Sequence, residues 1–175
     1  MDVGSSRIVL AAGSILDYKG DAMVNAANEG CVGGFGVDEM VNRAGGPELK
    51  EARKKLRGCA TGDAKVTPGF GHAHTRWIIH AVGPVYRVNR LKHGFDPDEE
   101  PERAAEFMRS LDHLLVGAHR AALQRAREVG ARTVGFCLLC AGVFRGARPL
   151  EEVVALDARA LLDELSRSPE DFDAL

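Results

Sequence analysis

Two segments of the chain are rich in glycine, a residue that lets backbone N–H groups approach a phosphate closely. Residues 33–36 read GGFG, and residues 140–146 read CAGVFRG. Each segment lies between an apolar run typical of a strand and a helical pattern. Because a helix N-terminus adds favourable partial charge, two such loops can hold the two phosphates of a pyrophosphate with few lysines.

The alternative interpretation is that these glycines only permit tight turns. Neither standard nucleotide-binding fingerprint occurs, since the sequence has no GxxxxGK[ST] and no GxGxxG between a strand and a helix. The spacing of the glycines therefore does not by itself identify a ligand.

Strand-like runs alternate with helical patterns along the chain. We expect strands over residues 7–12, 21–27, 64–67, 77–82 and 133–139. The spacing of apolar residues predicts helices over 37–44, 47–56, 102–129 and 150–165. The turn Gly45-Gly46-Pro47 ends the first helix, and Pro47 opens the second. Residues 87–101 are polar and predict a surface loop. The alternation predicts a three-layer α/β/α sandwich with a mixed, largely parallel central sheet.

Composition and charge narrow the class of protein. The 175 residues are 45% hydrophobic and 27% charged, which is typical of one soluble globular domain. Its 23 basic and 25 acidic residues give a net charge of −2, which gives no support for nucleic-acid binding. No signal peptide and no apolar run of about 20 residues is seen, so no membrane span is expected. Four cysteines favour a reducing, intracellular setting, cytoplasmic or nuclear in a eukaryote.

Two short motifs could each contribute to a metal site. Cys137 and Cys140 form a single CxxC, and His72 and His74 are separated by one residue. A zinc site needs a partner pair that neither motif has, so we expect no metal, and buried cysteines in a strand are the preferred interpretation.

Several further motifs occur in a fixed order along the chain. They read DAMVNAAN at 21–28, GGFGVD at 33–38, AGGP at 44–47, GCATGDA at 58–64, IHAVGP at 79–84 and CAGVF at 140–144. This ordered set resembles the signature of the macrodomain family, and its MacroD-like branch in particular. The resemblance covers residues 7–165 and implies one macrodomain-like domain over 1–175.

The resemblance implies that the chain binds ADP-ribose, with no cofactor. In the ADP-ribosyl hydrolases of the family, the asparagine matching Asn28 hydrogen-bonds the distal ribose and the aspartate matching Asp38 positions a water. Without the resemblance, Asp38 is explained by its place in the first turn of a helix, and Asn28 by a turn. The other residues expected to contact ligand are Ser14, Ile15, Ala27, Gly33, Gly34, Phe35, Gly36, Val37, Cys140, Ala141, Gly142, Val143, Phe144 and Arg145.

The sequence departs from the family pattern at four places. Ser14 stands where the family has an aspartate that binds the adenine amino group, and Phe35 replaces a loop glycine. Cys140-Ala141 replaces Ser-Thr, although Arg145 and Arg148 of the same loop can reach a phosphate. The usual final strand has no clear counterpart after residue 165.

These features leave three functions open. The first is hydrolysis of ADP-ribose conjugates, either removal of mono-ADP-ribose from proteins or deacetylation of O-acetyl-ADP-ribose. The second is a non-catalytic reader of ADP-ribose or ADP-ribosylated protein. The third, suggested only by Ser14, is binding of another nucleotide or of RNA.

Overall fold

The central sheet has four strands in the order β4-β5-β3-β6, in a computed structural model that describes residues 1–175. The strands are β3 (Gly20–Ala27), β4 (Ala64–Pro68), β5 (Thr75–Val82) and β6 (Val134–Phe136). Strand β3 pairs parallel with both β5 and β6, and β4 pairs antiparallel with β5. The predicted mixed, largely parallel sheet is therefore confirmed.

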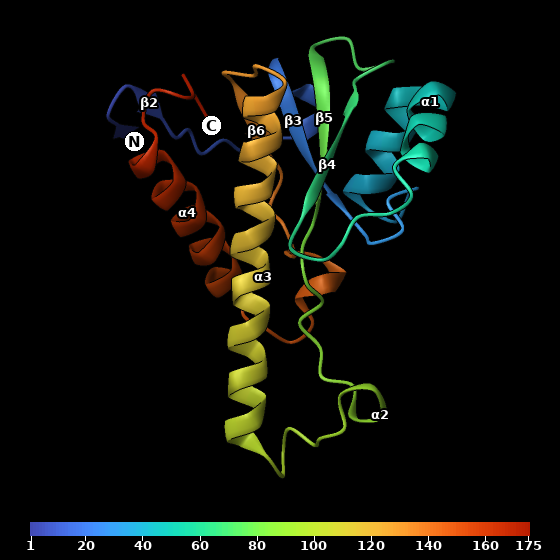
Figure 1. Cartoon of the computed structure of the whole chain (residues 1–175), viewed down its shortest axis with the longest axis vertical. Helices are drawn as coiled ribbons and strands as arrows, with labels where there is room; N and C mark the ends of the chain where they lie inside the picture. Colours follow the sequence, from blue (N-terminus) through green and yellow to red (C-terminus); the bar gives the residue numbers. More distant parts are fainter.

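Helices cover both faces of this sheet (Figure 1). Helix α1 (Val37–Lys55) contacts β3 and β4 on one face, whereas α3 (Pro101–Glu128) contacts β4 and β5 on the other, with α4 (Leu150–Arg167) packed beside α3. The short elements are β1 (Asp2–Val3), β2 (Ser6–Arg7), the 3-10 turns η1 (Ile15–Asp17) and η2 (Val143–Arg145), and α2 (Arg90–His93). The predicted three-layer sandwich is the observed architecture.

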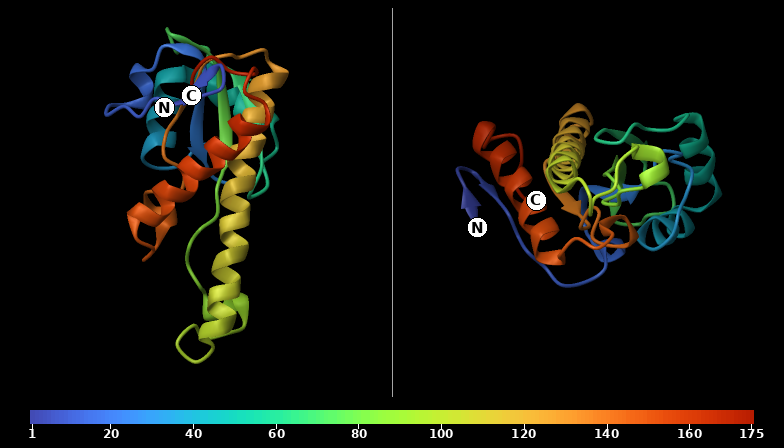
Figure 2. Two further views of the ribbon diagram at one scale, coloured as in Figure 1. Left: turned by 90° about the vertical axis from the view of Figure 1, so that its left-hand side faces the viewer. Right: turned by 90° about the horizontal axis from the view of Figure 1, so that it is seen from below.

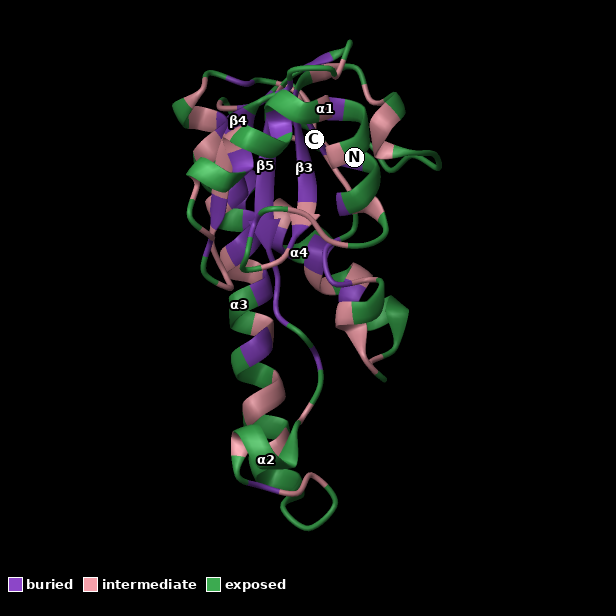
Figure 3. Ribbon diagram, turned by 90° about the vertical axis from the view of Figure 1, so that its right-hand side faces the viewer, coloured by how far each residue is buried: buried purple, intermediate pink, exposed green.

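The core explains why β3 lies in the interior of the sheet. Ala22, Met23 and Val24 are consecutive in β3 and each is at most 1% exposed, as expected for a strand buried on both faces. Met23 belongs to a small cluster with Val41 of α1, while Ala22 and Val24 belong to the 19-residue cluster that α3 and α4 cover. The strands are correspondingly buried in Figure 3, with α1 lying over them.

Helix α1 is bent where the turn Gly45-Gly46-Pro47 was predicted. Gly46 has φ 73° and ψ −167°, which is not helical and is a conformation that favours glycine. Pro47 then begins the second half of α1, as a proline does well at a helix start. The prediction of two helical segments separated at this turn is confirmed.

Two predicted strands are wrong in extent. Of the expected 7–12 strand, only Arg7 lies in a strand, β2 (Ser6–Arg7). Ile8 still packs against the main core cluster, but Leu10 is 92% exposed, because no layer covers that part of the run. The strand expected over 133–139 shortens to Val134–Phe136. Beyond β6, the left-handed Cys140 (φ 55°) turns the chain out of the sheet direction.

The last residues of the chain pair with the outer edge of β6. Ala174 forms isolated parallel bridges with Thr133 and with Arg7. The backbone N–H of Leu175 donates to the Arg7 carbonyl at 2.9 Å, and that of Val134 donates to the Ala174 carbonyl at 3.0 Å. At the place of the family's usual final strand, for which the sequence offered no clear counterpart, the chain forms only a short pairing that joins β6 to the N-terminal segment.

One part of the chain projects beyond the sheet as an arm. It points downward in Figure 1 and is seen from the side in Figure 2. It consists of the first half of α3 and the preceding segment that carries α2, within the predicted loop 87–101. The rings of His93, Phe95 and Phe107 pack together within it in tilted and edge-to-face arrangements, with centroids 4.5 to 6.3 Å apart. No helix of the chain is both long and apolar enough to span a membrane.

Candidate functional site at the carboxyl ends of the parallel strands

The three parallel strands end at one edge of the sheet. Strands β3, β5 and β6 end at Ala27, Val82 and Phe136. The loop after β3 (residues 28–36, loop one) leads into α1, and the loop after β6 (residues 137–149, loop two) leads into α4. Ligands of α/β proteins bind at such an edge. The two predicted glycine loops thus lie at the same end of the fold.

Loop two is fixed against the segment that follows β5. The backbone N–H of Tyr86 donates to the Phe144 carbonyl at 2.7 Å, and the Cys140 thiol donates to the Pro84 carbonyl at 3.1 Å. A Cβ added to Gly83 would lie 2.2 Å from Cys140 Sγ, so only glycine allows this approach. Loop two is therefore held in place by specific contacts with this segment.

Asn28 shapes loop one from its first residue. Its side-chain Nδ2 donates to the Gly33 carbonyl at 2.8 Å, and its Oδ1 accepts from the backbone N–H of Cys31 at 3.2 Å. The loop includes two glycines with positive φ, Gly33 at 148° and Gly36 at 65°. The turn role that was the alternative interpretation of Asn28 is therefore present in the structure.

Asp38 lies at the start of α1 and is only 2% exposed. Its Oδ1 accepts from Asn25 Nδ2 at 2.6 Å and from Arg53 Nη1 at 2.6 Å, whereas Oδ2 has no partner in the protein. A Cβ added to Gly34 would lie 2.9 Å from this free oxygen and 3.1 Å from Asn28 Nδ2. Asn28 and Asp38, ten positions apart in the sequence, thus converge on one glycine of loop one.

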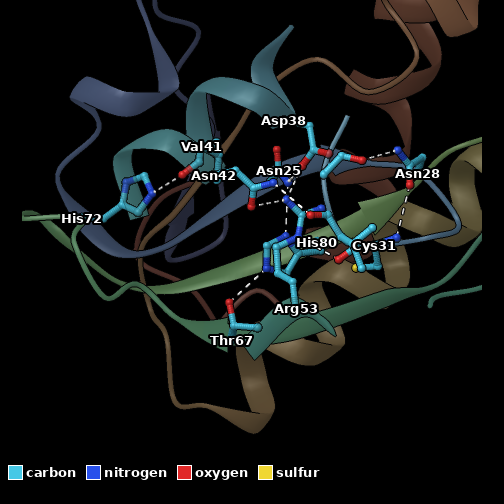
Figure 4. Close-up of polar contacts among 12 residues, drawn as sticks. Asn25, Asn28, Cys31, Asp38, Val41, Asn42, Arg53, Thr67, His72 and His80 are labelled. Atoms are coloured by element: carbon cyan, nitrogen blue, oxygen red, sulfur yellow. Dashed lines mark hydrogen bonds and ion pairs between the residues drawn. The ribbon is translucent and has the colours of Figure 1, made fainter. Parts of the chain in front are cut away.

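A buried polar network lies behind Asp38 (Figure 4). Asn25 of β3 is opposite His80 of β5 in the parallel register, and Asn25 Nδ2 lies 3.2 Å from His80 Nδ1. Burial lowers the pKa of His80 well below its ordinary value, and the Arg53 guanidinium lowers it further. Since Asn25 donates to Nδ1, the neutral ring carries its proton on Nε2 and donates it to Thr67 Oγ1 at 3.0 Å.

Sequence reasoning missed Asn25, Arg53 and His80 as members of this network. Asn25 and His80 are polar residues within otherwise apolar strands, and both are 0% exposed. A buried polar residue in a strand needs a hydrogen-bond partner, so these positions carried a usable signal. Arg53 lies in a helix rich in charged residues, so nothing in the sequence indicated that it would be buried.

The tip of loop two contains η2 and several predicted contact residues. Val143 is 78% exposed, and the half-buried Phe144 packs against the main core cluster. Arg145 Nη1 donates to the Arg148 carbonyl at 2.5 Å, and its buried Nε has no partner. Arg148 forms an ion pair with Asp112 and lies 4.6 Å from the centre of the Tyr86 ring. The structure therefore engages Arg148 with α3 rather than leaving it free for a phosphate.

A buried pair supports the base of loop two. The backbone N–H of Leu139 donates to Asp157 Oδ2 at 3.2 Å, and Asp157 Oδ1 lies 3.4 Å from His119 Nε2. His119 Nδ1 lies 2.9 Å from the Leu115 carbonyl, so it is the protonated nitrogen. Burial raises the pKa of Asp157 to about 8 and lowers that of His119 to about 4. Near neutral pH, both groups are predominantly uncharged.

All four cysteines are free thiols. Burial raises the pKa of each of them above its ordinary value, that of Cys59 to about 11 and that of Cys137 to about 12. Because the thiolate is the nucleophilic form, Cys140 of loop two is poorly suited to covalent catalysis. The polar groups that this edge offers to a ligand are carboxylate, amide and backbone groups.

Ser14 and Ile15 begin the η1 turn before β3. Ser14 Oγ accepts from the Leu16 backbone N–H at 3.3 Å, so its hydroxyl caps this turn. Ile15 packs beside the Met23 cluster under α1. Phe35 of loop one is 89% exposed, with no core contact.

The remaining predicted contacts frame the two loops. Ala27 is buried at the end of β3, and Val37 is half-buried at the start of α1. In loop two, Ala141 is half-buried and Gly142 is exposed. Ala27 and Val37 thus flank loop one, whereas Ala141 and Gly142 lie within loop two.

Two hollows of about 400 and 380 Å³ lie elsewhere, one between α1 and β4 and the other between α3 and α4. Neither hollow is lined by a predicted contact residue. No group of three or more His, Cys, Asp or Glu side chains has an arrangement suited to a metal ion.

The family model named Macro domain matches residues 24–156 of the chain. The chain belongs to the macrodomain family. Among curated relatives, a macro domain-containing protein of Caldanaerobacter subterraneus is 35% identical over 93% of this macrodomain and 83% of its own length. One of Ralstonia nicotianae is 42% identical over 71% of this chain and 61% of its own length.

Solved macrodomains have the same fold. The macrodomain of Trypanosoma brucei in complex with ADP-ribose is 30% identical, with a TM-score of 0.76 over 95% of this chain and 61% of that chain. The Oceanobacillus iheyensis macrodomain with ADP is 25% identical, with a TM-score of 0.79 over 96% of this chain and 81% of that one. This macrodomain thus spans about three-fifths of the Ralstonia and Trypanosoma chains and a larger part of the others.

Proposed function

We propose that this macrodomain binds ADP-ribose between loops one and two and hydrolyses ADP-ribose conjugates. The observation that carries the proposal is the convergence of the free Asp38 Oδ2 and the Asn28 amide on Gly34. Further support comes from the Trypanosoma and Oceanobacillus macrodomains, whose structures are described with ADP-ribose and with ADP.

The loops suit the two ends of such a ligand differently. Backbone N–H groups of the glycine segments, with the N-terminus of α1 behind loop one, favour the pyrophosphate. The adenine end has weaker support, because Ser14 caps η1 with its own hydroxyl and supplies no carboxylate. We therefore expect most of the binding free energy to come from the pyrophosphate and the distal ribose.

In the proposed reaction, Asn28 orients the distal ribose and Asp38 Oδ2 accepts a hydrogen bond from the attacking water. The water oxygen forms a bond to the anomeric carbon as the bond from that carbon to the modified side chain breaks. The electron pair of the breaking bond stays with the side chain. A phosphate oxygen of the ligand takes the proton that the water loses and passes it to the side chain, so the products are ADP-ribose and the unmodified side chain. Deacetylation of O-acetyl-ADP-ribose would use the same water against the acetyl carbonyl carbon.

The proposed partner is an ADP-ribosylated protein, and the proposed setting is a reducing compartment of the cell. The free state of all four cysteines supports that setting. A non-catalytic reader is the second candidate function. It is favoured by one observation, the 2% exposure of Asp38, which limits how far a water can approach its carboxylate.

The two functions separate in one experiment. An automodified ADP-ribosyltransferase is incubated with the wild type and with Asp38→Asn, and ADP-ribose binding is measured by calorimetry. Asparagine keeps an acceptor for Arg53, and circular dichroism checks that the fold is retained. We expect the wild type to release ADP-ribose and the variant to release it about 100-fold more slowly, the cost of losing one positioned group. Binding without release by either protein would favour the reader, and no binding would exclude both functions.

A further inference from the structure

Arg53 is the largest fully buried side chain in the macrodomain and is 0% exposed. Its Nε donates to the Cys31 carbonyl of loop one at 2.9 Å. Its Nη1 donates to Asp38 Oδ1 at 2.6 Å and to Asn42 Oδ1 at 2.8 Å. One guanidinium thus holds loop one, the first residues of α1 and the proposed catalytic carboxylate together (Figure 4).

This arrangement depends on the bend in α1. Arg53 follows Asp38 by 15 residues, and in a straight helix that separation would span roughly 22 Å. The two side chains cannot bridge such a distance. The non-helical Gly46 and the following Pro47 turn the second half of α1 back, which brings Arg53 to the start of the first half.

Stability alone is a poor reason for this ion pair. Removing two charges from water is costly, and apolar residues of similar size often serve a protein interior equally well. Both partners are nevertheless buried here, with side-chain exposures of 0% for Arg53 and 3% for Asp38. A buried charge beside a candidate catalytic carboxylate is therefore a candidate for a role in that site.

The hydrogen bonds to Asp38 are asymmetric. Arg53 and Asn25 both donate to Oδ1, and nothing in the protein donates to Oδ2. Two donors on one oxygen fix the rotation of the carboxylate and leave Oδ2 facing Gly34 of loop one. Asn42, itself bound to Arg53, donates to the Val32 carbonyl at 3.2 Å and holds the same loop.

We propose that Arg53 is a positioning residue for hydrolysis. It binds Asp38 Oδ1 so that Oδ2 presents its lone pairs to the reacting water, and it ties loop one to that carboxylate. This inference rests on the proposed hydrolase function. Arg53 itself touches neither substrate nor water, and its effect passes through Asp38.

The test compares Arg53→Met with the wild type, using release of ADP-ribose from an automodified transferase for kcat and calorimetry for ADP-ribose affinity. Arg127→Met is the matched control, because it makes the same chemical change at an ion pair with Asp171, near the C-terminus. We expect Arg53→Met to lower kcat about 100-fold, the cost of misplacing one reacting group by about 1 Å. ADP-ribose affinity is expected to stay within threefold, and the control to match the wild type.

The possible outcomes are distinct. An inactive wild type would contradict the proposed function, whereas an active wild type with kcat unchanged in Arg53→Met would overturn the role of Arg53 alone. Equal losses of affinity and kcat would also overturn it, because they would indicate that Arg53 only supports loop one and does not orient Asp38. If Arg53→Met fails to fold, Arg53→Lys decides between the same outcomes. Lysine keeps the positive charge but lacks the planar guanidinium with its several N–H donors. The value of kcat should therefore fall at least tenfold, with ADP-ribose affinity retained.

Discussion

The buried pair of Asp157 and His119 makes the stability of the macrodomain depend on pH. Burial raises the pKa of Asp157 from 3.8 to about 8 and lowers that of His119 from 6.5 to about 4. The folded state therefore binds more protons at Asp157, and the unfolded state binds more at His119. Between pH 4 and 6.5 the two effects oppose each other, so these groups change stability little there.

Above pH 6.5 only Asp157 still exchanges a proton on unfolding. Its raised pKa means that its contribution is lost as pH rises towards 8. Over about 1.5 pH units, at about 1.36 kcal/mol per unit, the free energy of unfolding should fall by about 2 kcal/mol. Asp157→Asn replaces the carboxyl group with an uncharged amide of the same shape and should remove this fall.

The measurement is urea unfolding of the wild type and Asp157→Asn at several values between pH 6 and 8.5. Taking the difference between the two proteins removes the titration of every group that they share. We expect the free energy of unfolding of the wild type, taken relative to that of the variant, to fall steadily between pH 6.5 and 8. A difference that is flat or rises over this range would refute the burial of a protonated Asp157.

Three further predictions concern single positions. Gly34→Ala places a methyl group 2.9 Å from Asp38 Oδ2, so ADP-ribose release should fall about 100-fold with the circular dichroism spectrum unchanged; normal turnover would contradict the proposed site. Leu115→Ala removes a fully buried side chain and should lower the free energy of unfolding in urea by about 2 to 5 kcal/mol, and a loss below about 1 kcal/mol would disprove its place in the core. Phe35→Gly removes a side chain that is 89% exposed and should change the free energy of unfolding in urea by less than about 0.5 kcal/mol. A larger loss would indicate that Phe35 packs against the rest of the protein.

Features that depend only on residues close together in the sequence were predictable. The turn at Gly45-Gly46-Pro47 was found because glycine and proline restrict the backbone locally. The continuous apolar run of β3 indicated a strand buried on both faces. Asn28 and Asp38 were found through the family resemblance, and their convergence at Gly34 agrees with the proposed roles without testing them.

Features that depend on distant partners were not predictable. The apolar run after Arg7 looked like a strand, but apolarity does not reveal whether a neighbouring layer is present to bury it. The contact between Arg53 and Asp38 depends on the angle at which Gly46 redirects a helix. The pairing of Ala174 with Arg7 joins residues far apart in the sequence, and no local sequence pattern indicates it.

That pairing also orders events during synthesis. At the outer edge of β6, Val134 and the preceding Arg132 bond to Asp173 and Ala174, which leave the ribosome after every other element of the fold. Until then, β6 exposes unpaired backbone groups that another nascent chain can pair with, a known route to aggregation. The N-terminal segment, although made first, must likewise wait for its partner. The β6 edge, which leads directly into loop two, is thus the last edge of the sheet to be paired.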